Sequence, residues 1–312
     1  LPSKSTSPEV TLRSPKIALS VLDLPAPFGP TITTMSDCSM AMLTPLSLFL
    51  LRRWLTHAVT RERLAPLPAN WTRRVADRVP AFRRLSGPEQ DKRLRDVRDL
   101  LTTRRWEGCG GLVLTDDMRL TIAAQACLIT LGFTGDPYPF LKTILVYPTT
   151  FVPNTPFQWI PDPHAAAQVP ELGQSWSDGA IVIAWDSAAG GAADPDDGRN
   201  VVMHEFAHQL DRADGEMDGI PSLPKARYAG WARLFAAEFQ RLVESAEAGR
   251  REVLDAYGTT DPAEFFAVAT EAFFERPHQL RRERPELFEE LVRYYRQDPA
   301  RWTDGPHVPE AR

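Results

Sequence analysis

The hydrophobic positions of the chain recur mainly with the spacing of helices. The pattern is helical from about residue 76 to residue 135, and residues 88–104 carry a charged face opposite an apolar one. Residues 121–131 are nearly all apolar, which is typical of a buried helix. Helical spacing dominates again over residues 225–297. These patterns predict a largely helical protein.

Two short runs between these helical regions predict strands. Residues 143–147 and 180–185 are rich in β-branched residues, and Gly179 precedes the second run. The segment 187–199 is rich in Ala, Gly and Asp, and we expect it to be an inserted loop. The fold class that we predict is α+β, with a small mixed sheet among helices.

The ends of the chain differ in composition from its centre. Residues 1–41 are rich in Ser, Thr and Pro without a sustained period, so we expect a disordered or spurious extension. A lead-in segment, 42–75, follows, and its apolar run of about ten residues is too short for a bilayer, which takes roughly twenty. We assign residues 76–302 to one domain and residues 303–312 to a tail.

Composition narrows the class of protein. The 312 residues are 43% hydrophobic, enough for a sizeable core. The net charge is −5 and the two signs are interspersed, so neither nucleic-acid binding nor stable membrane insertion is indicated. Three cysteines, Cys38, Cys109 and Cys127, show no C-x-x-C pairing, which is typical of reduced thiols in a cytoplasmic protein.

One short segment carries candidate chemistry. His204 and His208 stand four residues apart, and Glu205 directly follows the first. On a helix, residues four apart lie about 40° apart around the axis and about 6 Å along it, so both imidazoles can reach one Zn²⁺. Glu205 lies about 100° round, where a general base could take a proton from a metal-bound water. The pattern by itself recurs by chance in roughly one chain of this length in a hundred, so its setting matters.

The setting of these histidines is helical. No Gly or Pro interrupts the segment, and Asn200 is the predicted N-cap. The alternative is a buried helix whose histidines are satisfied by hydrogen bonds alone, but two unliganded histidines among apolar neighbours would be costly. Asp211, seven residues after His204, either orients a ligand histidine or lies at a solvated helix end.

A catalytic zinc usually has three protein ligands, so a third is expected. The remaining histidines have no comparable helical setting; they are His57, His164, His278 and His307. A second predicted helix, 262–275, begins after the N-cap Asp261 and supplies Glu264, Glu271 and Glu275. Glu264 could equally be the capping-box partner of Asp261. Because Glu264 and Glu271 lie about 10.5 Å apart along the axis, they cannot share one metal, and spacing alone leaves them as rivals.

Several segments carry a family resemblance. HEFAHQLD, the DG…GIP that follows it and DAYGTTDPAEFFAVATEAFF resemble the Mlc titration factor A family of bacterial zinc peptidases. More distantly, they resemble the catalytic domain of anthrax lethal factor. Three further segments look like parts of the same family: LVYPTTFVP (145–153), GQSWSDGAIVIAW (173–185) and RYYRQDPARW (293–302). The resemblance covers roughly residues 65–302, and the segment 187–199 departs from it.

The resemblance implies a zincin-like metallopeptidase fold and a set of site residues. It assigns His204, His208 and Glu264 as the ligands of one Zn²⁺ and Glu205 as the general base. Tyr257, seven residues before the ligand glutamate, would line the site and donate to the oxyanion. Without the family spacing, the alternative for Tyr257 is an aromatic side chain beside a helix that only packs.

The same resemblance implies two classes of function. The first is a zinc-dependent metallopeptidase, aminopeptidase-like, that hydrolyses peptides by a zinc-activated water. The second is a regulatory binding protein, because the namesake of the family sequesters a transcriptional repressor of sugar uptake. An intact Glu205 favours hydrolysis, since a pure binding protein has no use for the base.

Overall fold

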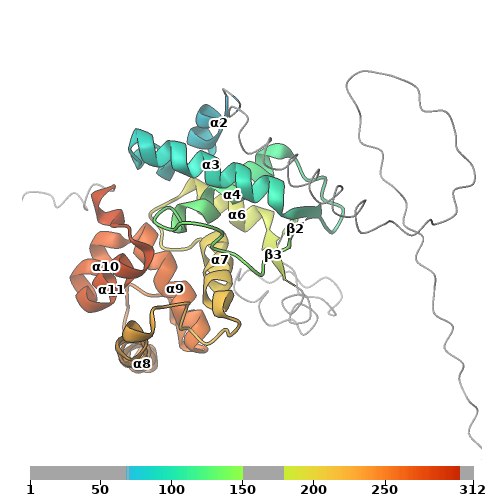
Figure 1. Ribbon diagram of the computed structural model, residues 1–312. Helices are drawn as coiled ribbons and strands as arrows, with labels where there is room; N and C mark the ends of the chain where they lie inside the picture. Colours follow the sequence, from blue (N-terminus) through green and yellow to red (C-terminus); the bar gives the residue numbers. More distant parts are fainter. Residues whose placement is uncertain (1–67, 69, 150–178, 303–312) are drawn as a thin grey trace, which may run out of the picture. The chain divides into compact units, whose positions relative to one another are not determined.

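A computed structural model of the protein describes residues 68, 70–149 and 179–302 (Figure 1). All of them lie in the second of the two compact units of the chain, Trp54–Arg312. None of the helices in these described ranges is long and apolar enough to cross a membrane.

The expected ends of the domain are only partly covered. The extension 1–41 and the tail 303–312 lie outside the described residues. Helix α2 (Trp71–Arg78) runs across the boundary that we expected between the lead-in segment and the domain. The described helical structure therefore begins before residue 76.

Helices make up most of the described structure. In chain order they are α2, α3 (Gly87–Thr103), α4 (Asp116–Ile129), α6 (Trp185–Ala193), α7 (Val201–Asp211), α8 (Lys225–Glu247), α9 (Pro262–Glu275), α10 (Pro277–Glu283) and α11 (Pro285–Tyr295). Short 3-10 helices are η1 (Pro80–Arg84), η3 (Arg212–Asp214), η4 (Ala256–Thr259) and η5 (Pro299–Arg301). The helical predictions for 88–104, 121–131 and 225–297 are confirmed by α3, by α4 and by α8 to α11.

A small sheet lies beside these helices. Its strands are β1 (Arg105–Gly108), β2 (Thr143–Tyr147) and β3 (Ala180–Ala184), in the order β1-β2-β3. Both pairs are parallel, so the mixed sheet that we expected is not seen among the described strands. Alternate residues of β2 and β3 are buried, which places one face of the sheet against the core.

Two local expectations were wrong. The helical pattern of the first region is broken by β1, which has only four residues and therefore little periodicity of its own. The segment 187–199 is not a simple loop, because α6 occupies its first half. Gly191 lies within α6 at a close approach, where a Cβ atom would come within 3.1 Å of Asn200 Cα. Tertiary packing thus overrides the low helix propensity of glycine here.

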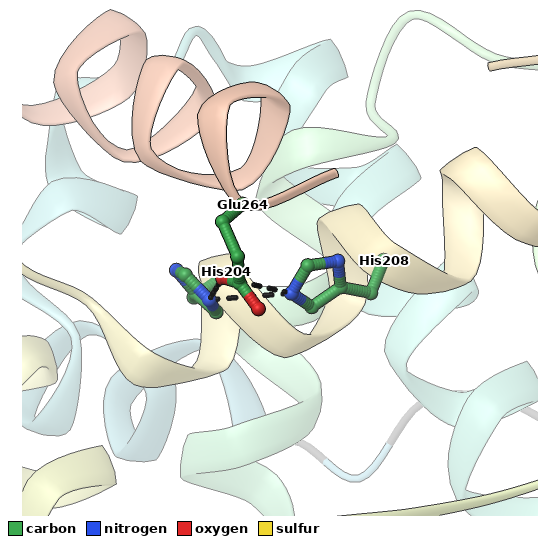
Figure 2. Close-up of side chains that lie close together, drawn as sticks. All are labelled: His204, His208 and Glu264. Atoms are coloured by element: carbon green, nitrogen blue, oxygen red, sulfur yellow. Dashed lines mark hydrogen bonds and ion pairs between the residues drawn. The ribbon is translucent and has the colours of Figure 1, made fainter. Parts of the chain in front are cut away.

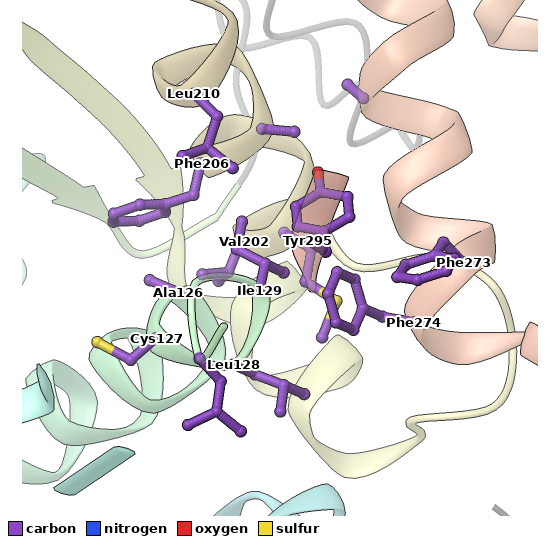
Figure 3. Close-up of a cluster of buried hydrophobic side chains, with 14 of the residues drawn as sticks. Ala126, Cys127, Leu128, Ile129, Val202, Phe206, Leu210, Phe273, Phe274 and Tyr295 are labelled. Atoms are coloured by element: carbon purple, nitrogen blue, oxygen red, sulfur yellow. The ribbon is translucent and has the colours of Figure 1, made fainter. Parts of the chain in front are cut away.

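The core is built around α7 and α9 (Figure 3). Every residue of α7 after the first is buried, and so is every residue of α9 after Pro262. Phe206 of α7 packs edge-on against Tyr138, with ring centroids 4.9 Å apart. Phe273 of α9 stacks with Tyr295 of α11. A helix that is buried all round sits at the centre of a domain, so side chains on these two helices have a rigid support.

Candidate metal centre

Helix α7 presents two histidines on one face. Asn200 caps the helix, because its Oδ1 accepts a hydrogen bond of 3.1 Å from the backbone N of Met203, as predicted. His204 and His208 are almost fully buried, at 2% and 1% exposure. Their Nε2 atoms lie 3.3 Å apart and their rings are nearly perpendicular. Two imidazole nitrogens therefore converge on one point beside the helix.

Helix α9 brings a carboxylate to the same point. Asp261 caps it, as predicted, by accepting a hydrogen bond of 2.9 Å from the backbone N of Glu264. The Glu264 side chain turns towards α7, where its Oε2 lies 2.9 Å from His204 Nε2 and 3.4 Å from His208 Nε2 (Figure 2). The Glu264 carboxylate thus joins the histidines. One donor atom from each of the three residues lies within 4.8 Å of the others.

The electrostatics of this cluster suit metal binding. Burial alone would lower the pKa of His204, but hydrogen bonds to Glu264 and Glu271 raise it well above its ordinary value. Burial likewise disfavours the charge of Glu264, yet the two histidines hold the pKa of its carboxyl well below the usual range. Glu264 is therefore an anion. A buried anion beside two imidazoles is a donor set that a divalent cation fits, since its charge replaces that of the proton.

The rival glutamate reaches the other edge of the same imidazole. Glu271 Oε1 lies 2.7 Å from His204 Nδ1, whereas Glu264 lies on the Nε2 side with His208. The two glutamates are thus separated by the width of one ring. Of the two, only Glu264 belongs to the three-residue donor cluster.

Glu205 and Tyr257 both lie close to the cluster. Glu205 is buried, at 8% exposure, and this burial raises the pKa of its carboxyl. Tyr257 belongs to η4, and its ring centroid lies 6.0 Å from that of His204. Gly258 lets η4 approach α8, because a Cβ atom there would lie 3.1 Å from Leu242 Cδ2. The turn that carries Tyr257 is therefore packed closely against α8.

Asp211 is not at a solvated helix end, so that alternative was wrong. It is fully buried, and its Oδ2 accepts a hydrogen bond of 2.8 Å from the backbone N of Gly219. Burial raises the pKa of its carboxyl to about 7. The carbonyl of Gly219 in turn accepts from Trp231 Nε1 of α8. Asp211 thus ties the end of α7 to the loop that leads into α8.

A second set of buried contacts, which was not predicted from the sequence, joins α9 to the start of α7. Glu271 Oε2 accepts from the backbone N of Asn200 at 2.5 Å, and Glu275 Oε1 accepts from Asn200 Nδ2 at 2.9 Å. The signal was present as three glutamates at spacings of seven and four residues, which is one face of an otherwise apolar helix. Buried carboxyl groups need partners, so such a stripe indicates a polar network.

We expect Glu275 to make a contribution to the stability that falls as the pH rises. Burial, with the negative charges of Glu271 and Asp197, raises the pKa of its carboxyl from 4.5 to about 9 and outweighs the hydrogen bond from Asn200. Between these two values, Glu275 therefore keeps its proton in the folded protein, whereas in the unfolded chain it has released it. Because the folded state binds more protons, the free energy of unfolding decreases from about pH 4.5 to about pH 9.

We therefore expect the variant Glu275→Gln, which cannot ionise, to be more stable than the wild type at about pH 8, by up to about 5 kcal/mol. The difference should shrink towards about pH 4.5, where the wild-type side chain is protonated in the folded state and half-protonated in the unfolded chain. Thermal midpoints of the two proteins across this range give the test. A wild type that gains stability relative to the variant as the pH rises would contradict the assignment.

The sequence matches a metallopeptidase family. The chain belongs to the glucose-regulated metallo-peptidase M90 family, whose pattern matches residues 51–296. It is 33% identical over 251 residues to Mlc titration factor A of Serratia proteamaculans, covering 79% of this chain and 92% of that protein. An uncharacterised protein of Synechocystis sp. is 40% identical over 238 residues, with 75% and 86% coverage. The resemblance to the Mlc titration factor A family is thereby confirmed, while the likeness to anthrax lethal factor stays a prediction.

Proposed function

We propose that this protein is a zinc-dependent metallopeptidase, aminopeptidase-like, that hydrolyses short peptides. The observation that carries the proposal is the buried cluster of His204, His208 and Glu264, with donor atoms within 4.8 Å of one another. Membership of a metallopeptidase family supports it independently. The cluster supplies two imidazole nitrogens and one carboxylate oxygen, a ligand set that zinc uses in hydrolases with one position left open.

The residues around the cluster can perform the proton transfers of hydrolysis. Zinc, when bound, lowers the pKa of a water and polarises the substrate carbonyl. Glu205 follows a ligand on the same helix, and in our proposal it takes the proton of the attacking water and delivers it to the leaving amine. Tyr257, on the neighbouring turn, would donate a hydrogen bond from its hydroxyl to the oxyanion of the tetrahedral intermediate.

A second function is favoured by the names of the relatives. Several of them are called Mlc titration factor A, and titration of the Mlc repressor requires a binding surface rather than a catalyst. The alternative is therefore that this protein sequesters a transcriptional repressor. The presence of Glu205 beside the ligands supports hydrolysis over binding alone.

We also propose a zincin-like fold and a cytoplasmic location for this protein. The zincin-like fold is supported by the arrangement of α7, which carries His204 and His208, beside α9, which carries Glu264. A cytoplasmic location is suggested by the few cysteines of the chain, of which the described Cys109 and Cys127 are free thiols.

The proposal is tested by metal analysis and hydrolysis assays on the purified chain. We expect one zinc per chain, loss of peptide hydrolysis on removal of the metal with a chelator, and recovery on addition of zinc. A panel of chromogenic amino-acid amides and short peptides defines the substrate class. A zinc-loaded protein that cleaves none of them but retains a repressor on a column would favour the binding function.

Tyr257→Phe tests the role of the phenol. Phenylalanine keeps the ring that packs beside His204 but removes the donor, so we expect zinc content and the thermal midpoint to be unchanged. Hydrolysis should fall by roughly 10- to 1000-fold, mainly in kcat, because the hydrogen bond forms to the developing oxyanion. Steady-state kinetics of the zinc-loaded variant measure this, and an unchanged kcat would return Tyr257 to a packing role.

A further inference from the structure

The imidazole of His204 is held from both of its edges. On one edge, Nε2 lies 2.9 Å from Glu264 Oε2 inside the donor cluster. On the other edge, Nδ1 lies 2.7 Å from Glu271 Oε1, and both side chains are 2% exposed. The Nδ1 contact lies away from the cluster. It is therefore available to set the orientation of the ring without occupying a ligand position.

The same carboxylate also holds the backbone that carries this histidine. Glu271 Oε2 accepts a hydrogen bond of 2.5 Å from the backbone N of Asn200, the N-cap of α7. Asn200 lies one helical turn before His204. A negative charge at the N-terminus of a helix is also favoured by the helix dipole. One side chain from α9 thus fixes both the start of α7 and the ring one turn later.

Such a contact determines which nitrogen of the ring can bind a metal. A carboxylate oxygen accepts hydrogen bonds, so Glu271 favours the form of His204 that has its proton on Nδ1. In the neutral ring, Nε2 then carries the free lone pair, and Nε2 is the atom that faces Glu264 and His208. A carboxylate in this position also makes the imidazole a stronger donor.

We propose that Glu271 is a positioning residue of the metal centre, which fixes the tautomer and the orientation of His204 and anchors the first turn of α7. This role rests on the proposed zinc function. It assigns different tasks to the two glutamates of α9, because Glu264 binds the metal and Glu271 holds the histidine that binds it. The contact spans 67 residues of sequence, so it also locks α9 against α7 at the site.

Glu271→Gln is the variant that tests the role. Glutamine has nearly the same size, but an amide N–H₂ replaces one of the two carboxylate oxygens that contact His204 Nδ1 and the backbone N of Asn200, so it cannot accept at both positions. We expect zinc affinity to fall by about 10- to 100-fold, while the stoichiometry at saturating zinc stays at one. Competition with a chromophoric chelator at neutral pH measures the dissociation constant.

The matched control is Glu275→Gln. Glu275 lies one turn further along α9 and contacts the side chain of Asn200, but no contact joins it to the histidines of the donor cluster among the described hydrogen bonds. Its raised pKa of about 9 means that glutamine replaces an already neutral group at neutral pH. We therefore expect the zinc affinity of Glu275→Gln to stay within about twofold of the wild type. This change is much smaller than the loss of about 10- to 100-fold that we expect for Glu271→Gln.

A spectroscopic measurement separates positioning from folding and needs no variant of Glu271. In zinc-loaded wild-type protein labelled with ¹⁵N-histidine, His204 should carry its proton on Nδ1, and its signals are assigned by their absence in His204→Asn. A proton on Nε2 would overturn the proposal, and so would an unchanged zinc affinity in folded Glu271→Gln. A wild-type chain that binds no zinc would instead overturn the metal centre itself.

Discussion

Glu264→Ala should leave the purified protein without its metal, while Glu271→Ala should still bind one zinc per chain. Glu264 supplies the only carboxylate oxygen of the three-residue cluster, and its anionic charge offsets that of the cation. Removing it leaves only the two imidazoles of the cluster, too few ligands for a tightly held zinc. Glu271 contacts the outer edge of His204, so its loss weakens affinity but removes no ligand.

Zinc content after dialysis against zinc-free buffer distinguishes the two variants. His204→Ala and His208→Ala serve as positive controls, because each removes a ligand and should abolish binding in the same way. Near-UV circular dichroism of each metal-free variant checks that the fold persists. The assignment of Glu264 and Glu271 would have to be exchanged if zinc were lost from the Glu271 variant and kept by the Glu264 variant.

The parts of the site that could be predicted are those with local signals. Asn200 and Asp261 cap helices through atoms three residues away, so the sequence around each helix start identifies them. The pairing of His204 with His208 likewise depends on one helical turn. These contacts require only that each helix forms, which its apolar spacing already indicates.

The contacts that could not be predicted join residues far apart in the sequence. Spacing along α9 left Glu264 and Glu271 as rivals, because the choice depends on how α9 packs against α7, more than sixty residues earlier. The strand β1 was missed for the same reason. Its four residues pair with β2 across an intervening helix, and a parallel pair needs such a crossover rather than a local turn.

The variant Glu205→Gln should lose most of the peptide hydrolysis while it still binds zinc. Glu205→Gln keeps the size of the side chain and its capacity for hydrogen bonds, but an amide cannot accept the proton of the attacking water. Because Glu205 is not in the donor cluster, the variant should bind zinc as the wild type does. Peptide hydrolysis should fall by at least about a hundredfold, the scale expected when a general base is removed.

Zinc content, thermal midpoint and turnover of this variant have to be measured on the same preparation. Zinc content and the thermal midpoint should match the wild type, so that the lost turnover can be assigned to proton transfer rather than to loss of the metal or of the fold. Glu205 is buried at 8% exposure, and glutamine at this position adds no charge that would disturb its surroundings. Near-native turnover by zinc-loaded Glu205→Gln would exclude this mechanism. In α7, Glu205 is the only carboxylate that lies next to one of the two histidines in the sequence.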